Sequence, residues 1–203
     1  MKLAVSILSA KGKKERIKVI EELNNSKADY IHFDVADGKF VSSKYLCIPE
    51  LVKLIKLSKK KNDVHLMVEN PMVYIEQIKN LNIDNITIHV EINQALKRII
   101  DYIKKNNIKV GLAIDLNTSI DAVKPYLKDI NRVLIMTVKA GKGGQQFQPQ
   151  VLEKIKRLPN NIEIEFDGGI NDRTIGYVKN ADIVVSGSYI LDDIKNNIDK
   201  LKE

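Results

Sequence analysis

The chain has 203 residues, of which 44% are hydrophobic and 29% are charged, with only 10 Gly and 5 Pro. This length and composition predict a single globular domain with its own core, and they exclude collagen-like and disordered chains. No apolar run approaches the roughly 18 residues that span a bilayer, so we predict no membrane association.

The formal net charge of +7 is compatible with a polyanionic partner. The basic residues are dispersed, however, and no nucleic-acid-binding motif accompanies them. The densest cluster, Lys56 with residues 59–61, lies where a helix is expected to end, and the helix dipole favours cations there. We therefore predict no nucleic-acid partner, whereas a small phosphorylated anion remains a good fit.

The single cysteine, Cys47, cannot form an internal disulfide, which favours a reducing compartment. The apolar stretch 3–10 imitates a signal peptide only faintly, since it is at the short limit for one. We interpret it as the first strand of a cytoplasmic protein.

Short β-branched or apolar runs alternate with amphipathic stretches along the whole chain, without a linker. Eight runs predict strands, at residues 3–9, 30–35, 63–68, 85–90, 109–115, 132–138, 162–168 and 182–187. The segments between them have helical periodicity, at residues 13–24, 49–58, 71–80, 93–106, 119–127, 149–157, 171–179 and 190–202. Pro125 lies inside its segment and is expected to shorten or break that helix.

Eight consecutive βα units predict an α/β fold, a (β/α)₈ TIM barrel that forms a single domain over residues 1–203. A doubly wound sheet is the structural alternative, because periodicity alone does not separate the two. The glycines favour the barrel, since seven of the ten lie at or just after the carboxyl end of a predicted strand, which is the functional face of a barrel. These are Gly38, Gly141, Gly143, Gly144, Gly168, Gly169 and Gly187.

Histidines and carboxylates share faces of the predicted strands. Alternation places His32 and Asp34 on one face, His65 on a face with Asp63, and Asp167 at the end of a row of acidic residues. If these rows point inward, two imidazoles and two carboxylates meet at the mouth of the barrel. Such a set is competent for zinc or another first-row divalent ion.

The alternative for each of these residues is a structural one, in which each histidine is a satisfied core or rim residue and each aspartate belongs to a turn or cap. Their joint placement at strand ends favours a site. His89 has no partner in the sequence, so we assign it to the core.

Three segments with the chemistry of a phosphate site follow the last three predicted strands. Residues 139–145 (KAGKGGQ) form a glycine-rich turn, residues 167–169 read DGG and residues 186–188 read SGS. Glycine-rich turns offer backbone N–H groups to an anion, and barrel phosphate sites are frequent in the loops after strands seven and eight. A pattern such as GKGG alone also describes an ordinary flexible loop.

Several segments carry a more specific signal when they are taken together, in order and with their spacing. They are 6–10 (SILSA), 32–41 (HFDVADGKFV), 63–68 (DVHLMV), 136–138 (MTV) leading into the glycine turn, 167–170 (DGGI) and 186–188 (SGS). Over nearly the whole chain, this arrangement resembles the ribulose-phosphate 3-epimerase family.

The resemblance implies interconversion of ribulose 5-phosphate and xylulose 5-phosphate, a reaction of the pentose phosphate pathway. It implies one divalent metal ion (Zn, Mn, Fe or Co) held by His32, Asp34, His65 and Asp167. Asp34 and Asp167 would also be the acid–base catalysts, and Ser6 with His65 would contact substrate, as would Asp167. The family's phosphate contacts fall on Gly141, Lys142, Gly143, Gly144, Gly168, Gly169, Gly187 and Ser188.

The chain departs from the family pattern at several positions without losing an acid, a base or a ligand. Val5 replaces a proline, and Ala36 replaces a methionine of the sulfur-rich wall to which Met67 and Met136 belong. The loop 41–44 lacks the usual proline–asparagine pattern, and Lys142 replaces a phenylalanine. A lysine at this position either swings toward the bound phosphate or points to solvent.

We therefore predict a metal-dependent epimerase that acts at C3 of a phosphorylated ketose. Two carboxylates suit this reaction, because a proton must leave one face of the carbon and return to the other, through an enediolate. An epimerase for allulose 6-phosphate and a non-catalytic phosphosugar-binding barrel remain alternatives. The identity of the metal and assembly into a homo-oligomer stay open.

Overall fold

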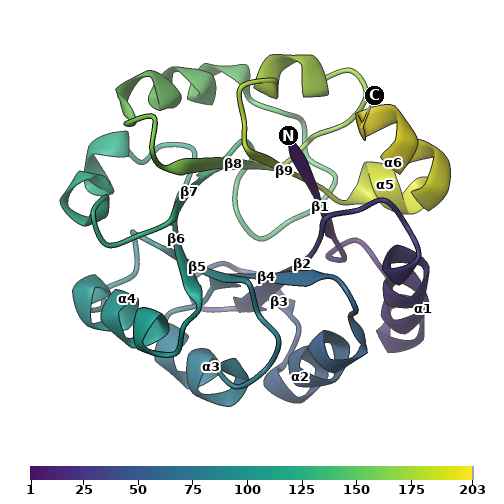
Figure 1. The fold of residues 1–203 in the computed structure, drawn as a ribbon, viewed down its shortest axis with the longest axis horizontal. Helices are drawn as coiled ribbons and strands as arrows, with labels where there is room; N and C mark the ends of the chain where they lie inside the picture. The colour runs from purple at the N-terminus through teal and green to yellow at the C-terminus, as the bar shows by residue number, and fades with distance from the viewer. Residues whose placement is uncertain (203) are drawn as a thin grey trace.

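Parallel strands close into a barrel that helices surround (Figure 1). The computed structural model describes residues 1–202. The strands follow one another around the barrel in chain order, and β1 pairs with both β2 and β9, which closes it. The barrel strands are β1 (Lys2–Ser6), β2 (Tyr30–Asp37), β4 (Lys61–Met67), β5 (Asn85–His89), β6 (Lys109–Ile114), β7 (Arg132–Met136), β8 (Glu163–Asp167) and β9 (Ile183–Ser186). The predicted (β/α)₈ barrel is confirmed, and the doubly wound alternative is wrong.

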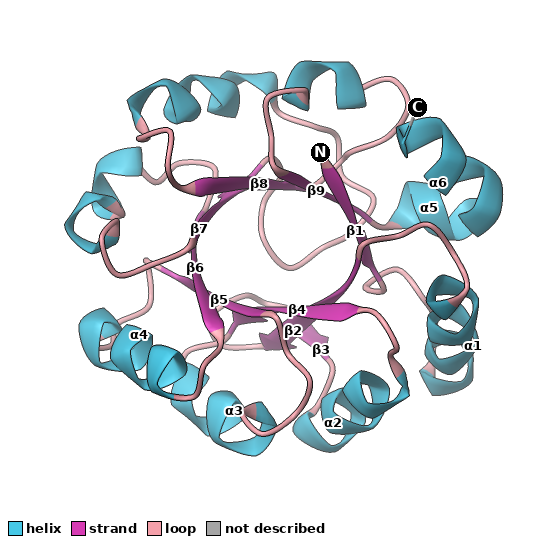
Figure 2. Cartoon of the chain, in the orientation of Figure 1, coloured by secondary structure: helices cyan, strands magenta, loops and turns pink. Residues whose placement is uncertain are grey.

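Helices and 3₁₀ turns form the outer ring of the barrel (Figure 2). The α-helices are α1 (Lys13–Asn24), α2 (Ile48–Leu57), α3 (Pro71–Ile78), α4 (Leu96–Lys105), α5 (Ser188–Asp192) and α6 (Ile194–Lys202). The 3₁₀ segments are η1 (Ile120–Ala122), η2 (Lys124–Tyr126), η3 (Pro149–Arg157) and η4 (Ile175–Val178).

The outer elements differ from regular α-helices in four of the predicted segments. The segment with Pro125 is broken into two short 3₁₀ turns, as expected from the missing N–H of proline. The segments 149–157 and 171–179 contain 3₁₀ turns in place of α-helices, and the second of them includes Gly176, which weakens helices. The last predicted helix is split at Asp193, whose backbone is extended.

A short strand, β3 (Lys44–Tyr45), was not predicted. It pairs antiparallel with the end of β2, where Tyr45 lies opposite Ala36. Two residues are too few to show a periodic pattern, so the sequence gives no signal for it. The Tyr45 hydroxyl donates a hydrogen bond to the carbonyl of Ile7, so β3 is connected to the segment that follows β1.

The apolar core lies between the strands and the outer ring. Outward-facing Ile31, Phe33 and Val35 of β2 are fully buried there, in one cluster with α2 residues such as Leu51 and Leu54. Removing apolar surface from water at about 25 cal/mol per Å² makes this layer the main source of stability.

The inside of the barrel is polar instead. The inward rows of β2, β4, β5, β7 and β8 bury Tyr30, His32, Asp34, Asp63, His65, Asn85, Thr87, His89, Arg132 and Glu165. The histidine and aspartate rows thus point inward, which is the condition on which the predicted metal site depends. Arg132 was missed as a partner, although its guanidinium lies 2.9 Å from Glu165 and 3.2 Å from Asp63.

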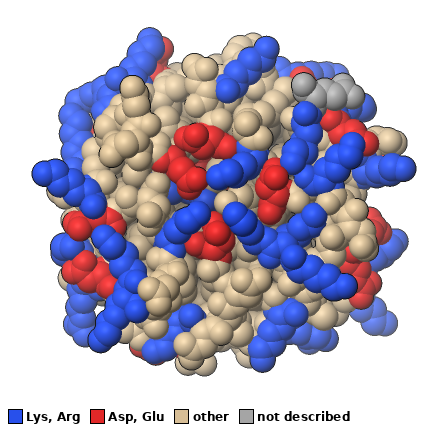
Figure 3. Space-filling model, viewed as in Figure 1, with Lys and Arg blue, Asp and Glu red and all other residues tan. Residues whose placement is uncertain are grey.

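The surface charges are mixed. Figure 3 shows basic and acidic side chains interspersed on one face of the molecule. Ion pairs such as Lys2 with Glu163 and Lys109 with Asp84 join opposite charges. Within residues 1–202, no helix combines the length and the apolarity that crossing a membrane requires.

Gly111 on β6 generates a stability prediction. A Cβ at this position would lie 2.2 Å from the Thr87 Oγ1 atom and 3.3 Å from the Asn85 Nδ2 atom, both inside the barrel. Overpacking a closed interior costs about 1–3 kcal/mol. We expect Gly111→Ala to lower the free energy of unfolding by that amount and the Tm by about 2–12 °C, as measured by urea and thermal unfolding.

Gly176→Ala is the matched control, because a Cβ at Gly176 meets nothing within 4 Å. There the same change reduces only the entropy of the unfolded chain and is expected to be neutral or stabilising by up to about 1 kcal/mol. Equal unfolding midpoints for the two variants would contradict the packing argument.

Candidate active site

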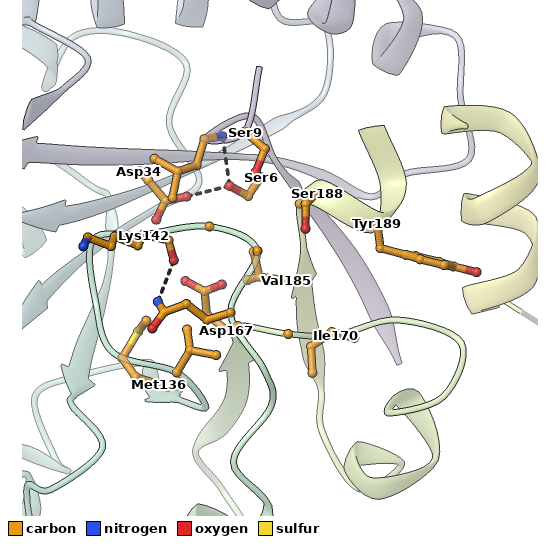
Figure 4. Close-up of a pocket in the computed structure, with 18 of the residues that line it drawn as sticks. Ser6, Ser9, Asp34, Met136, Lys142, Asp167, Ile170, Val185, Ser188 and Tyr189 are labelled. Carbon is orange, nitrogen blue, oxygen red and sulfur yellow. Dashed lines mark hydrogen bonds between the residues drawn. The ribbon is translucent and has the colours of Figure 1, made fainter. Parts of the chain in front are cut away.

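A cavity of about 190 Å³ lies at the carboxyl ends of the strands, where the loops after β1, β7, β8 and β9 meet (Figure 4). Asp34 and Asp167 line it from β2 and β8, two strands that β9 and β1 separate in the barrel. Both carboxylates therefore face the same small volume. His32 and His65 are fully buried, and neither belongs to the cavity lining.

Four side chains converge at the base of this cavity: His32, Asp34, His65 and Asp167. One potential ligand atom from each lies within 4.8 Å of all the others. His65 Nδ1 lies 3.1 Å from Asp34 Oδ1 and 3.7 Å from Asp167 Oδ2. His32 Nε2 lies 3.5 Å from Asp34 Oδ1 and 3.9 Å from Asp167 Oδ2. The structure thus brings together the four residues that the sequence singled out as a set.

The chemistry of this set fits a divalent metal ion. His32 Nδ1 lies 2.9 Å from Asp63 Oδ2, so a neutral His32 donates from Nδ1 and leaves Nε2 with a lone pair. That buried Nε2 has no hydrogen-bond partner among the described residues, and it faces the carboxylates of Asp34 and Asp167. A bare nitrogen beside acidic oxygens is a ligand arrangement for Zn²⁺ and similar ions.

The environment drives the pKa values of the two aspartates apart. Burial alone would raise the pKa of Asp34, but the positive charge of His32 and the hydrogen bond with His65 Nδ1 outweigh it and hold that pKa well below its usual range. Burial raises the pKa of Asp167 to about 7, and the nearby charge of Asp34 adds to the shift. Burial likewise lowers the pKa of His65 to about 4.

Ser6 is held directly against Asp34. Its hydroxyl donates to Asp34 Oδ2 at 2.6 Å and accepts the backbone N–H of Leu8 at 3.1 Å (Figure 4). These two contacts fix the rotamer of Ser6 and orient one carboxylate oxygen of Asp34. Ser6 also lines the cavity, so its oxygen lies beside any bound molecule.

The glycine-rich loop after β7 closes the opposite side of the cavity. The Gln145 side chain donates to the carbonyls of Lys139 and Lys142, at 2.6 and 2.7 Å. Gly169, in the loop after β8, has a φ of +65°, and a Cβ there would lie 2.6 Å from the Phe147 backbone nitrogen. Only glycine allows these two loops to approach so closely.

The candidate phosphate contacts lie together on this cavity. Its lining includes Gly141, Lys142, Gly143, Gly144, Gly168, Gly169, Gly187 and Ser188. In Figure 4 the side chain of Lys142 points away from Ser188, so the backbone of Lys142 belongs to the loop while its ammonium is turned aside.

Apolar side chains form one wall. Met67 and Met136 line the cavity and pack in one cluster with Ala36 and Val138. Of the three wall residues named from the sequence, Met67 and Met136 thus carry sulfur. The third, Ala36, contributes only a methyl group.

The sequence reasoning missed several cavity residues: Leu8, Ser9, Gln145, Ile170, Asn171, Val185 and Tyr189. Most of them lie in loops whose path no periodicity predicts. His89 is buried as expected, but it has partners, since its Nε2 lies 2.8 Å from His65 Nε2 and its Nδ1 lies 3.0 Å from Glu91 Oε2.

Solved structures with low sequence identity share the barrel. The chain superimposes on 3-hexulose-6-phosphate synthase from Salmonella typhimurium with a TM-score of 0.73 at 13% identity, over 99% of this chain and 96% of that one. The tryptophan synthase A-subunit from Pyrococcus furiosus gives the same TM-score and identity, over 99% of this chain and 97% of that one. These similarities concern the fold alone.

Relatives with higher identity define the family. A ribulose-phosphate 3-epimerase of Helicobacter pylori is 38% identical over 201 residues, covering 95% of this chain and 91% of the relative. The ribulose-phosphate 3-epimerase of Methanocaldococcus jannaschii is 35% identical over 216 residues, covering all of this chain and 90% of the relative. The family model described as "Ribulose-phosphate 3 epimerase family" matches residues 2–191. The polar barrel mouth described above is thus that of a carbohydrate isomerase, and the chain belongs to the ribulose-phosphate 3-epimerase family.

Proposed function

We propose that this protein epimerises C3 of a phosphorylated ketose, interconverting ribulose 5-phosphate and xylulose 5-phosphate. The observation that carries the proposal is the presence of two carboxylates, Asp34 and Asp167, on one cavity at the barrel mouth. The names of the relatives support ribulose phosphate as the substrate. We assign the activity to a single domain over residues 1–203, of which Glu203 lies outside the described residues. We also propose that the protein is cytoplasmic, because the exposed thiol of Cys47 stays reduced in that compartment.

In the proposed mechanism the two aspartates act on opposite faces of the same carbon. One carboxylate removes the proton from C3, next to the C2 carbonyl; the C–H electron pair forms a C2=C3 double bond and the negative charge moves to the C2 oxygen, which gives an enediolate. The other carboxylic acid returns a proton to the opposite face, which inverts C3. The two residues exchange roles when the reaction runs in reverse, so each needs access to the cavity, as both have.

His32, Asp34, His65 and Asp167 are the residues that would hold a divalent ion. Such an ion supplies Lewis acidity, which stabilises negative charge that develops on substrate oxygens. Ser6 orients Asp34 through its 2.6 Å hydrogen bond. Met67 and Met136 keep water away from the reacting carbon, because they supply an apolar surface beside the carboxylates.

The phosphate would lie at the far end of the cavity from the aspartates. Gly141 to Gly144, with Lys142 contributing its backbone, together with Gly168, Gly169, Gly187 and Ser188, would hold it through backbone N–H groups and the Ser188 hydroxyl. Binding there anchors the substrate, so that C3 is held between the carboxylates.

Isotope exchange tests the function. We expect incubation with ribulose 5-phosphate in deuterated water to give xylulose 5-phosphate labelled at C3, as followed by NMR. Binding of ribulose 5-phosphate without label at C3 would indicate a non-catalytic phosphosugar-binding barrel. Faster turnover of allulose 6-phosphate than of ribulose 5-phosphate would contradict the proposed substrate.

Removal of either carboxylate tests the two-base assignment. We expect Asp34→Asn and Asp167→Asn each to lower kcat by at least about 10²–10⁴-fold with the fold retained, because an amide cannot shuttle the proton. Initial rates are measured on protein whose far-UV circular dichroism matches that of the wild type. Asp172→Asn, an exposed aspartate in the loop after β8, is the control and is expected to keep full activity. Near-normal turnover in either active-site variant would rule out the assignment.

Metal removal tests the role of the ion. We expect prolonged dialysis against a chelator to abolish activity, and Zn²⁺, Mn²⁺, Fe²⁺ or Co²⁺ to restore it, because the ligand set suits all four ions. The metal content is measured by elemental analysis beside each assay. Full turnover by protein shown in this way to be metal-free would exclude the role.

A further inference from the structure

A chain of hydrogen bonds runs from His65 out of the cluster at the cavity base. His65 Nε2 lies 2.8 Å from His89 Nε2, and His89 Nδ1 lies 3.0 Å from Glu91 Oε2. The two imidazole planes are inclined by only 22°, with ring centroids 5.0 Å apart. Both histidines are fully buried, whereas the Glu91 side chain is 25% exposed. The chain therefore connects the cluster to the rim of the barrel.

The direction of these hydrogen bonds follows from Glu91. A carboxylate only accepts, so His89 Nδ1 carries a proton and donates it to Glu91. When His89 is neutral, its Nε2 has a lone pair and accepts a hydrogen bond from the N–H at His65 Nε2. A neutral His65 in turn has its lone pair on Nδ1.

The lone pair on His65 Nδ1 faces two acidic oxygens, Asp34 Oδ1 at 3.1 Å and Asp167 Oδ2 at 3.7 Å. With no metal ion bound, a proton on His65 Nδ1 would be donated to Asp34 Oδ1, so Asp34 and Glu91 favour opposite tautomers of His65. A divalent ion between these atoms requires the bare Nδ1 that Glu91 favours. His32 also has a bare nitrogen, Nε2, but a single hydrogen bond is enough to set its tautomer, because Asp63 accepts directly from its Nδ1. Both histidines thus present a bare nitrogen to the same volume.

Glu91 is itself held in place by the backbone. Its Oε1 accepts the N–H of Asp115 at 2.8 Å, just past the end of β6, while Oε2 faces His89. Each of its two oxygens therefore has a defined donor. Glu91 also lines a second cavity, of about 470 Å³, beside the glycine-rich loop.

We propose that His89 and Glu91 are positioning residues that select the tautomer of His65 with a bare Nδ1 and hold its ring toward the metal site. This inference deepens the proposed function, on which it rests. Neither residue touches the cavity of Asp34 and Asp167, so both act through His65. Partners of this kind typically change metal affinity by about 10–100-fold.

Glu91→Gln tests the proposal with little change in shape. The N–H of Asp115 still requires an oxygen, so the new amide places its oxygen there and turns its NH₂ group toward His89 Nδ1. His89 must then accept at Nδ1 and donate from Nε2, which forces His65 to accept at Nε2 and to carry its proton on Nδ1. The substitution therefore reverses the whole chain of hydrogen bonds.

Two measurements read this out. In metal-free protein, ¹⁵N NMR of the imidazoles is expected to show a larger fraction of His65 with its proton on Nε2 in the wild type than in Glu91→Gln, where the proton moves to Nδ1. Competition with a chromophoric chelator is expected to give a Kd for Zn²⁺ about 10–100-fold higher in the variant. Glu69→Gln is the control, because this exposed carboxylate just beyond β4 pairs with Lys39 at 3.8 Å, away from His89, and it is expected to change neither readout.

The proposal is overturned if Glu91→Gln keeps the wild-type tautomer of His65 and a Zn²⁺ affinity within twofold of the wild type. A wild-type protein that binds no Zn²⁺ would instead contradict the metal role under the proposed function. In that case the NMR measurement alone decides whether Glu91 sets the tautomer. The two hypotheses therefore fail by different results.

Discussion

Charge inside a closed barrel must meet opposite charge, and this constraint organises the whole interior. Moving an ion out of water costs several kcal/mol even after relaxation, so a buried ion that lost its partner would be strongly destabilising. Arg132 lies at the base of the barrel beside Asp63 and Glu165, all three without exposed surface. Burial raises the pKa of Glu165 to about 8, so Asp63 and the partly exposed Glu163, 3.4 Å from the guanidinium, carry much of the negative charge that Arg132 requires. Asp63 divides its oxygens, one toward Arg132 and the other toward His32. The ion pair at the base thereby fixes an imidazole at the mouth.

Because side chains alternate along a strand, the residues that stabilise the fold and the residues of the site lie on opposite faces of it. Odd and even positions of β2 point to opposite faces, so Ile31, Phe33 and Val35 join the apolar layer while His32 and Asp34 enter the barrel. A substitution in one layer leaves the other layer's contacts in place. The barrel can carry a polar interior because its apolar core lies elsewhere.

Much of this arrangement could be predicted from the sequence, because alternation and βα order are local patterns. The eight barrel strands follow from them, as does the fact that His32 and Asp34 share one face of their strand. The contact between His65 and His89 could not be predicted in the same way. It depends on the register of β4 against β5, in which His65 pairs with Thr87, and no single strand encodes a register.

Arg132 and the loop residues show the same limit. Arg132 reads as the polar start of a strand, and only the closed barrel places it between Asp63 and Glu165. The 3₁₀ character of η3 escapes prediction as well, since its apolar spacing suits an α-helix equally. Contacts between distant segments, rather than local preferences, decide each of these cases.

The closure of the barrel by β1 bears on how the molecule folds. Lys2 pairs with Ile183, and Val5 pairs with Ser186, so strand partners lie about 180 positions apart in the chain. Such distant pairing carries a large loop-closure entropy and makes folding slow, because nearly the whole polypeptide must be ordered before this contact stabilises it. Ser6 reaches Asp34 from this same strand, and Ser188 lies two residues after the end of β9, the partner of β1. The proposed substrate contact of Ser6 therefore becomes complete only when β1 pairs with β9, and a partly folded intermediate with β1 unpaired would carry the aspartates without the serine that orients Asp34.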